Sequence, residues 1–92
     1  MESISSDQLR AARMLLHLSQ AELAKRAEVG IATVQRLELG QEIRSPQIQA
    51  IVRVLREAGI LIIPGGTYIG DTEVEVGVAL VRDRRKGNVS LE

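Results

Sequence analysis

Cysteine, phenylalanine and tryptophan are absent from this 92-residue sequence, which has one tyrosine, Tyr68, and one histidine, His17. Without cysteine the chain can form no disulfide, thiolate metal site or cysteine nucleophile. A single histidine cannot build a metal site, and His17 is expected at a helix end rather than as a ligand. Single-stranded nucleic acid is bound by stacking bases on aromatic side chains, so the lack of aromatics disfavours that mode.

Net charge is also lacking, because twelve Lys and Arg residues balance twelve Asp and Glu residues. A net charge of zero removes the simplest argument that the chain binds nucleic acid. Whether a basic surface exists depends on how the charged residues are distributed. No signal peptide is visible, and the apolar run ILIIP is far too short to span a bilayer. We therefore expect a cytoplasmic location, associated with a bacterial nucleoid if DNA is the partner, with no membrane, metal or cofactor.

Apolar residues recur at helical spacing in two long segments, residues 6–17 and 47–58. Ser45 and Pro46 precede the second of these with the pattern of a cap and a first-turn proline, and Gly59 closes it. Together with the two shorter helices described next, these segments supply the expected core. The residues expected to face inward are Leu9, Ala12, Leu15, Leu16, Leu23, Ala24, Ala27, Val34, Leu37, Ile48, Ile51, Val52 and Leu55.

A helix that stops and restarts lies between these two segments. Ser19, with Glu22 three residues later, forms a capping box that predicts a helix over residues 20–27. A second helix is expected over residues 31–39, ended by Gly40. Two helices joined by a three-residue turn at a wide angle make a helix-turn-helix, in which the first braces the second so that it can protrude.

The turn itself, Glu28-Val29-Gly30, has an apolar plug in Val29 and a glycine that we expect to permit the tight backbone. The outer face of the second helix is expected to carry Ile31, Ala32, Thr33, Gln35 and Arg36. Short and hydrogen-bonding side chains suit the major groove of DNA.

The last third of the chain has the alternating apolar pattern of β-structure. We expect one strand over the residues ILII and another over EVEVGVALV, joined by a turn or flexible loop in PGGTYIGD. The expected division is a DNA-binding domain over 1–59, a strand tail over 60–82 and a charged end over 83–92. We expect the charged end to be a solvated tail and not a supplementary DNA-binding arm.

An isolated hairpin is marginal, so these strands must lie on the helices or pair with a second copy. Pairing across a homodimer is favoured, because an apolar unpaired edge is a liability. The residues expected to form that interface are Leu61, Ile63, Val74, Val76, Val78 and Leu80.

The stretch RMLLHLSQAELAKRAEVGIATVQRLELG, residues 13–40, resembles the helix-turn-helix of the XRE family, the Cro and phage-repressor type. The resemblance covers residues 6–59 and is most specific in LSQAELA, the valine of the turn, TVQRLE-G and the serine-proline start of the last helix. It implies a mainly α fold: a lambda-repressor-like domain of four to five helices, here with a short C-terminal β tail.

By this resemblance, Gln20 contacts the DNA backbone and a base, and the start of the second helix reads bases. Base contacts would then come from Gln20, Ile31, Ala32, Thr33, Gln35 and Arg36. Phosphate contacts would come from Gln20, Arg44 and Ser45. The resemblance also implies a structural ion pair between Arg13 and Glu38.

Two departures from the family pattern concern the turn. The family commonly has glycine where this chain has Glu28, and serine or threonine where it has Gly30, so the second helix lacks a side-chain cap. In addition, Ile31 and Ala32 cannot hydrogen-bond bases and can meet only thymine methyl groups.

These features predict a non-enzymatic transcriptional regulator that binds a palindromic operator in double-stranded DNA as a homodimer. One alternative is an antitoxin that binds a toxin and also represses its own operon. Another is a protein-binding antiactivator that uses the same fold without DNA. A plain αα-hairpin, with Gln35, Arg36 and Arg44 as ordinary surface residues, is the simplest competing interpretation.

Overall fold

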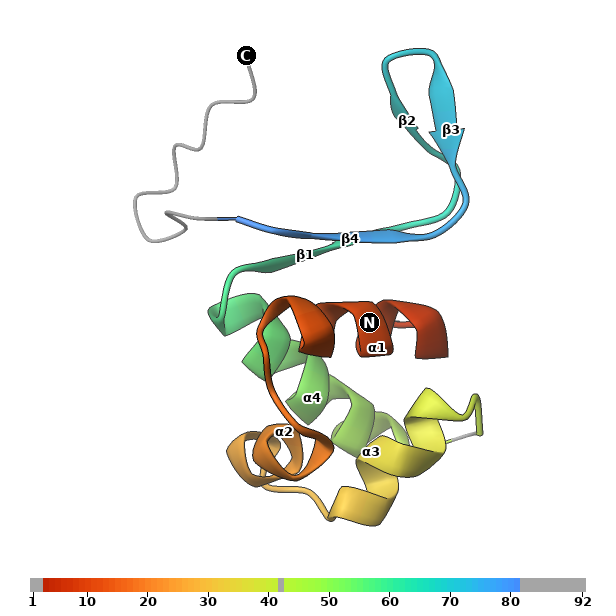
Figure 1. Ribbon diagram of the computed structural model, residues 1–92. Helices are drawn as coiled ribbons and strands as arrows, with labels where there is room; N and C mark the ends of the chain where they lie inside the picture. Colours follow the sequence, from red (N-terminus) through yellow and green to blue (C-terminus); the bar gives the residue numbers. More distant parts are fainter. Residues whose placement is uncertain (1–2, 42, 82–92) are drawn as a thin grey trace.

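The computed structural model describes residues 3–41 and 43–81, so the expected charged end lies outside the described residues. Four helices are followed by four short strands in this part of the chain (Figure 1). The fold is therefore mainly α with a strand tail, as expected from the sequence. The elements are α1 (Ser6–Leu15), α2 (Gln20–Ala27), α3 (Ile31–Glu38), α4 (Ser45–Glu57), β1 (Ile60–Ile63), β2 (Thr67–Ile69), β3 (Thr72–Val74) and β4 (Gly77–Leu80).

The helices meet in one core of aliphatic side chains. Most of the residues expected to face inward are buried there, but Leu15 is 41% exposed. Helix α1 ends at Leu15 and not at His17. Leu16 is the C-cap and His17 has a left-handed φ of 57°. The buried hydrophobic residues are Leu9, Ala12, Leu18, Leu23, Ala24, Ala27, Val34, Leu37, Ile51, Val52, Leu55 and Ile60.

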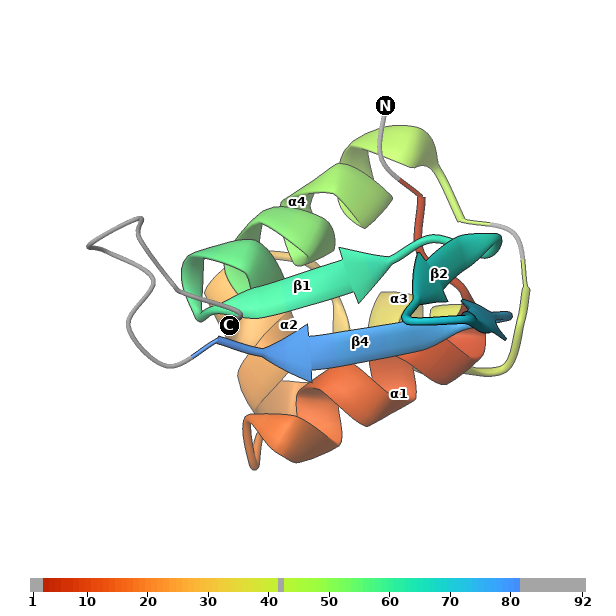
Figure 2. The same cartoon turned by 90° about the horizontal axis from the view of Figure 1, so that it is seen from above.

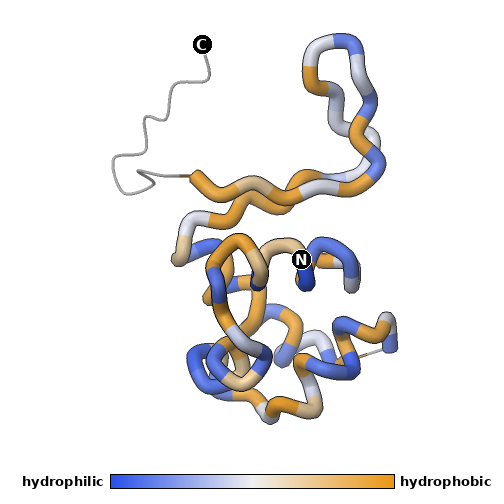
Figure 3. The backbone as a smooth tube through the Cα atoms, in the orientation of Figure 1, coloured by the Kyte–Doolittle hydropathy of each residue, from blue (hydrophilic) through white to orange (hydrophobic). Residues whose placement is uncertain are grey.

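Strands β1 and β4 pair with each other in antiparallel register, with Leu61 opposite Ala79 and Ile62 opposite Val78. The pair forms a layer over α1 and α4, on the side of the molecule away from the turn between α2 and α3 (Figures 1 and 2). Figure 3 shows that these strands are the most hydrophobic part of the tail. The sequence favoured pairing between two copies; the structure shows pairing within one chain.

The rest of the tail forms an arm that leaves the helical body (Figure 1). The prediction of a turn or loop over PGGTYIGD was wrong, because Thr67–Ile69 pairs with Thr72–Val74 as a hairpin. A single strand over EVEVGVALV was also wrong, because a bend at residues 75–76 separates β3 from β4. Gly65 allows this break: a Cβ there would lie 2.9 Å from the backbone oxygen of Glu75.

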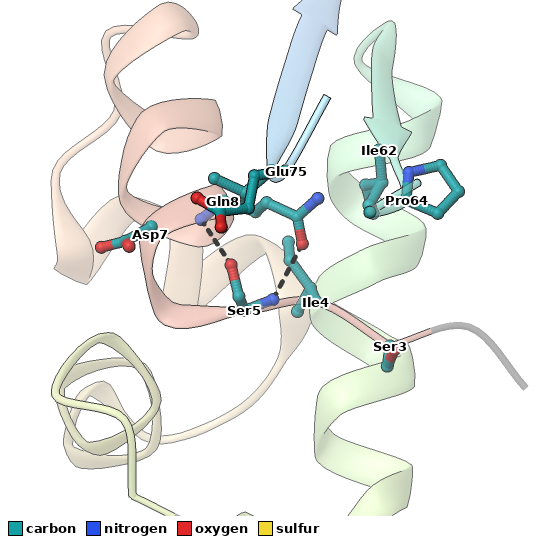
Figure 4. A pocket seen from close by; sticks show the side chains of 10 residues that line it. Ser3, Ile4, Ser5, Asp7, Gln8, Ile62, Pro64 and Glu75 are labelled. Atoms are coloured by element: carbon teal, nitrogen blue, oxygen red, sulfur yellow. Dashed lines mark hydrogen bonds between the residues drawn. The ribbon is translucent and has the colours of Figure 1, made fainter. Parts of the chain in front are cut away.

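Gln8 joins the helices to the strands at the point where β1 and β4 part. Its side-chain nitrogen donates to the backbone oxygens of Ile63, at 2.9 Å, and Gly77, at 3.0 Å. Its side-chain oxygen accepts from the backbone nitrogen of Ser5, the N-cap of α1, at 3.0 Å (Figure 4). Gln8 is 7% exposed, so every one of these bonds replaces water in a buried site.

Replacing Gln8 by alanine is expected to lower the free energy of unfolding by about 1–3 kcal/mol, because two backbone oxygens lose their buried donor. Urea denaturation measures the change. Gln35→Ala is the control, since Gln35 is exposed on α3 and its loss should change stability by less than about 0.5 kcal/mol. Equal stability for the two variants would contradict this role of Gln8.

Candidate DNA-binding surface

The turn between α2 and α3 is made possible by Glu28. This residue is the C-cap of α2 and has a left-handed backbone, with φ 58° and ψ 41°. Gly30 has an ordinary extended backbone, with φ −71° and ψ 150°, and open space where a Cβ would stand. The expectation that Gly30 permits the tight backbone was therefore wrong. Glu28 occupies the position where the family commonly has glycine.

A left-handed backbone costs a non-glycine residue about 1–2 kcal/mol, and glycine avoids this cost. Glycine also has more conformational freedom in the unfolded chain, which offsets about 0.5–1 kcal/mol of the gain. We therefore expect Glu28→Gly to raise the free energy of unfolding by about 0.5–1 kcal/mol, measured by thermal or urea denaturation. Gly30→Ala is the matched control and should give no gain. If Gly30→Ala does not fold and Glu28→Gly is no more stable than the unmodified protein, the residue that needs a special backbone conformation is Gly30 and not Glu28.

One face of α3 is open to solvent. Ile31 is 45% exposed, and Ala32, Gln35 and Arg36 are exposed beside it. Leu39, the C-cap of the helix, is 75% exposed and continues the same helical face. This face is apolar at both ends and polar in the middle.

Thr33 does not belong to that face, so its predicted outward placement was wrong. It is 8% exposed, and its hydroxyl accepts a hydrogen bond from the side-chain nitrogen of Gln47 on α4, at 3.4 Å. A residue two positions after Ile31 lies about 200° around the helix, which turns Thr33 toward α4. Thr33 therefore helps to dock α3 on the core.

Glu38 anchors the other end of α3. Its carboxylate accepts from Arg13 Nε at 2.6 Å and Arg13 Nη2 at 3.1 Å, which is the expected ion pair. The side chains are 4% exposed for Glu38 and 16% for Arg13. Arg13 Nη1 also donates to the backbone oxygen of Leu18, and Arg10 donates to the backbone oxygen of Glu38. The hydrogen bond to Glu38, together with its charge, raises the pKa of Arg13, although burial opposes this.

The same carboxylate fixes Gln20, the first residue of α2. The side-chain nitrogen of Gln20 donates to Glu38 Oε1 at 3.0 Å. Because an ionised carboxylate can only accept, the amide nitrogen of Gln20 must face inward and its oxygen must face away from Glu38. Gln20 therefore carries an oriented amide at the start of α2.

The Ser19–Glu22 capping box holds the start of α2, as expected. The backbone nitrogen of Ser19 donates to the Glu22 carboxylate at 2.8 Å, and the Ser19 hydroxyl accepts from the backbone nitrogen of Glu22. Hydrogen bonds from Ser19 lower the pKa of Glu22. The carboxylate therefore stays ionised, and the cap stays intact, down to a lower pH than for an ordinary glutamate.

Helix α4 begins two residues before the predicted range, and its N-cap lies one residue before the predicted cap. Arg44 is the N-cap, Ser45 is the first helical residue, and Pro46 follows in the first turn. Ser45 is therefore not the cap, and Arg44 provides no side-chain cap. Arg44 is exposed, directly after the loop that follows α3.

Charge is divided unevenly along the chain. Residues 1–59 contain eight basic and seven acidic residues, whereas residues 60–81 contain three acidic residues and no basic residue. The ion pair between Arg13 and Glu38 is neutral as a whole. Among the described residues of α2, α3 and the loops beside them, the exposed basic residues are Lys25, Arg26, Arg36 and Arg44, and the exposed acidic residues are Glu22 and Glu28. This surface therefore has a small excess of positive charge.

Elsewhere the described residues offer little for other chemistry. A pocket of about 660 Å³ lies where the arm meets α1, with Asp7, Gln8, Pro64 and Glu75 in its lining (Figure 4). No group of three or more potential metal ligands occurs in the described part of the chain. None of the described helices is both long and apolar enough to cross a bilayer.

Comparison with known proteins identifies the class. The helix-turn-helix family model, of the XRE type, matches residues 9–60, and this chain belongs to that family. It is a DNA-binding transcription regulator of the XRE type. No curated protein matches the chain significantly.

Proposed function

We propose that this protein binds a palindromic operator as a homodimer, with α3 of each subunit in the major groove. The solvent-exposed face of α3 supports this most directly. The buried residues Glu38 and Thr33 of the same helix hold it on the rest of the domain. A protruding helix can enter a groove only if the rest of the chain keeps it rigid.

Each exposed side chain of α3 has a distinct task in this proposal. Arg36 donates two hydrogen bonds to guanine, and Gln35 pairs with adenine. Ile31 and Ala32 pack against thymine methyl groups, because they have no polar atoms to offer. Gln20 presents its amide oxygen toward the groove from α2, consistent with its fixed orientation.

Phosphate contacts are assigned to Gln20, Arg44 and Ser45. Arg44 is exposed at the N-terminus of α4, where a free cation can reach the backbone of a duplex that lies against α3. The free positive charge of this surface is small, so each subunit neutralises few phosphates. We therefore expect a monomer to bind weakly and two subunits to bind half-sites about 34 Å apart.

Fluorescence anisotropy with labelled genomic fragments, measured at a series of salt concentrations, tests the proposed function. The expected result is binding that weakens with salt, with a shallow slope of roughly 0.9 per phosphate contacted. Absence of salt-sensitive binding to double-stranded DNA would overturn the proposal.

A second candidate is a protein-binding regulator, and the apolar ends of the α3 face favour it. Ile31 and Leu39 together present exposed aliphatic surface on a helix. In that case DNA binding would be absent and α3 would dock a protein. The related possibility of an antitoxin keeps the DNA binding and adds a protein partner, which co-purification from the native host would identify.

A further inference from the structure

The arm formed by β2 and β3 carries Tyr68, the only tyrosine of a sequence that has no phenylalanine or tryptophan. Tyr68 is 63% exposed, and it lies opposite Glu73 in the antiparallel register of the arm. Directly opposed residues have Cβ atoms about 4.5–5.5 Å apart and share one face, so the ring and the carboxylate can contact one ligand together. The core and the proposed DNA-binding surface make no use of this pair.

The carboxylates of the arm have no counter-charge nearby in the sequence. Residues 60–81 contain three acidic residues, Asp71, Glu73 and Glu75, and no basic residue. Glu73 and Glu75 are exposed, and neither side chain forms an ion pair or a hydrogen bond within the described part of the chain. An exposed ring beside an unpaired carboxylate attracts a cation through both its face and its neighbour.

Two adjoining cavities lie at the base of the arm. The cavity of about 660 Å³ has Asp7 and Glu75 in its lining (Figure 4), and a second cavity, of about 440 Å³, has Glu73 and Glu75. Both include Gly65, so together they form one groove that leads toward the arm. Asp7 is paired with Arg10, whereas Glu73 and Glu75 are free to meet a ligand. Among the residues that the structure describes, no Lys, Arg or His lines either cavity.

This acidic surface lies away from the proposed DNA-binding surface. The arm rises from the sheet on the side opposite the turn between α2 and α3 (Figure 1). Its negative charge also repels the phosphates of a duplex. A ligand on the arm can therefore stay bound while α3 contacts DNA.

A guanidinium group is the cation that suits the pair of Tyr68 and Glu73 best. It is planar, so it stacks on an aromatic ring, and it donates two parallel hydrogen bonds to a carboxylate. A lysine ammonium group is a strongly hydrated point charge that offers neither match. Val76, which is 45% exposed in the lining of the groove, provides apolar surface for the aliphatic part of such a side chain.

We propose that the arm and the groove at its base bind an arginine-containing segment of a partner protein. One guanidinium lies against Tyr68 and Glu73, and a second basic side chain of the segment enters the groove at Glu75. The surface extends over the arm and two cavities, so it suits an extended segment rather than a single small cation. Pairing between the arms of two copies is disfavoured, because each arm adds three acidic residues and no basic one.

The composition of the chain makes the arm directly observable. Because the sequence has one tyrosine and no tryptophan, the intrinsic fluorescence of the protein comes from Tyr68. The probe is the peptide acetyl-Gly-Arg-Leu-Arg-Gly-amide, which has no aromatic residue, titrated into the full chain at millimolar concentrations. Matched peptides have lysine or glutamate in place of both arginines. The variant is Glu73→Gln, and the control with the same change of net charge is Glu57→Gln, at an exposed glutamate of α4.

The expected result is a saturable change of Tyr68 emission with the arginine peptide, weaker binding of the lysine peptide and no response to the glutamate peptide. Glu73→Gln should weaken binding of the arginine peptide about tenfold, because a charged hydrogen-bond acceptor is lost, and Glu57→Gln should leave it unchanged. Equal affinities for the arginine and lysine peptides, equal affinities of the two variants, or no saturable response overturns the inference. A change of Tyr68 emission on dilution of the protein alone would show that a second copy covers the arm, and would overturn it as well.

Discussion

Replacing Glu38 by alanine is expected to lower the free energy of unfolding by about 3–5 kcal/mol, the largest stability effect in this chain. The carboxylate is almost fully buried and is the common acceptor for Arg13 and Gln20. Its loss leaves the guanidinium of Arg13 partly buried without a counter-charge. Urea denaturation, followed by far-UV circular dichroism, measures the change.

A double-mutant cycle separates the ion pair from the rest of the network. Arg13→Met combined with Glu38→Leu removes both charges and should recover a large part of the stability lost in either single variant. If the single variants Glu38→Leu and Arg13→Met each cost less than about 1 kcal/mol, the network does not anchor α3. The account of how this helix is held would then be wrong.

Arg36→Ala is expected to produce the largest loss of specific DNA binding with little change in stability. Each arginine that contacts guanine contributes about 1–3 kcal/mol of discrimination, and a two-fold site contains two. The affinity for the operator should therefore fall roughly 30-fold to 20,000-fold. Anisotropy with the selected operator, and with a scrambled duplex, gives the two affinities that define specificity.

Arg53→Ala is the matched control, since Arg53 is an exposed arginine on α4 and no part of the α3 face. It should leave specificity unchanged. If Arg36→Ala weakens binding to the operator and the scrambled duplex equally, Arg36 contacts phosphate and does not read a base. If Arg53→Ala has the larger effect, the DNA lies against another face.

Local chemistry made much of the helical part predictable. The Ser19–Glu22 capping box specifies where α2 begins, and Gly40, with φ 83°, ends α3 as a C′ glycine. Both signals act within a few residues, so the sequence displays them directly. The pair between Arg13 and Glu38 spans 25 residues and was expected only because of the family resemblance.

Contacts between distant segments could not be predicted in this way. Gln8 bonds to Ile63 and Gly77, 55 and 69 residues away, and no local pattern marks a glutamine as a buried donor. The arm was missed because Gly65, Gly66 and Gly70 suggested a flexible loop, although glycines also permit the bends of a broken hairpin. Thr33 was misplaced because a short polar side chain suits both a DNA groove and a buried contact with α4.

Selection of bound sequences from randomised double-stranded DNA tests the central claim most directly. The account predicts enrichment of a two-fold-symmetric motif whose half-sites are centred about 10 base pairs apart, one helical turn, with guanine and thymine at conserved positions. Loss of the guanine preference in Arg36→Ala would link that motif to α3. Enrichment of no motif, or of one half-site without symmetry, would contradict a paired recognition helix.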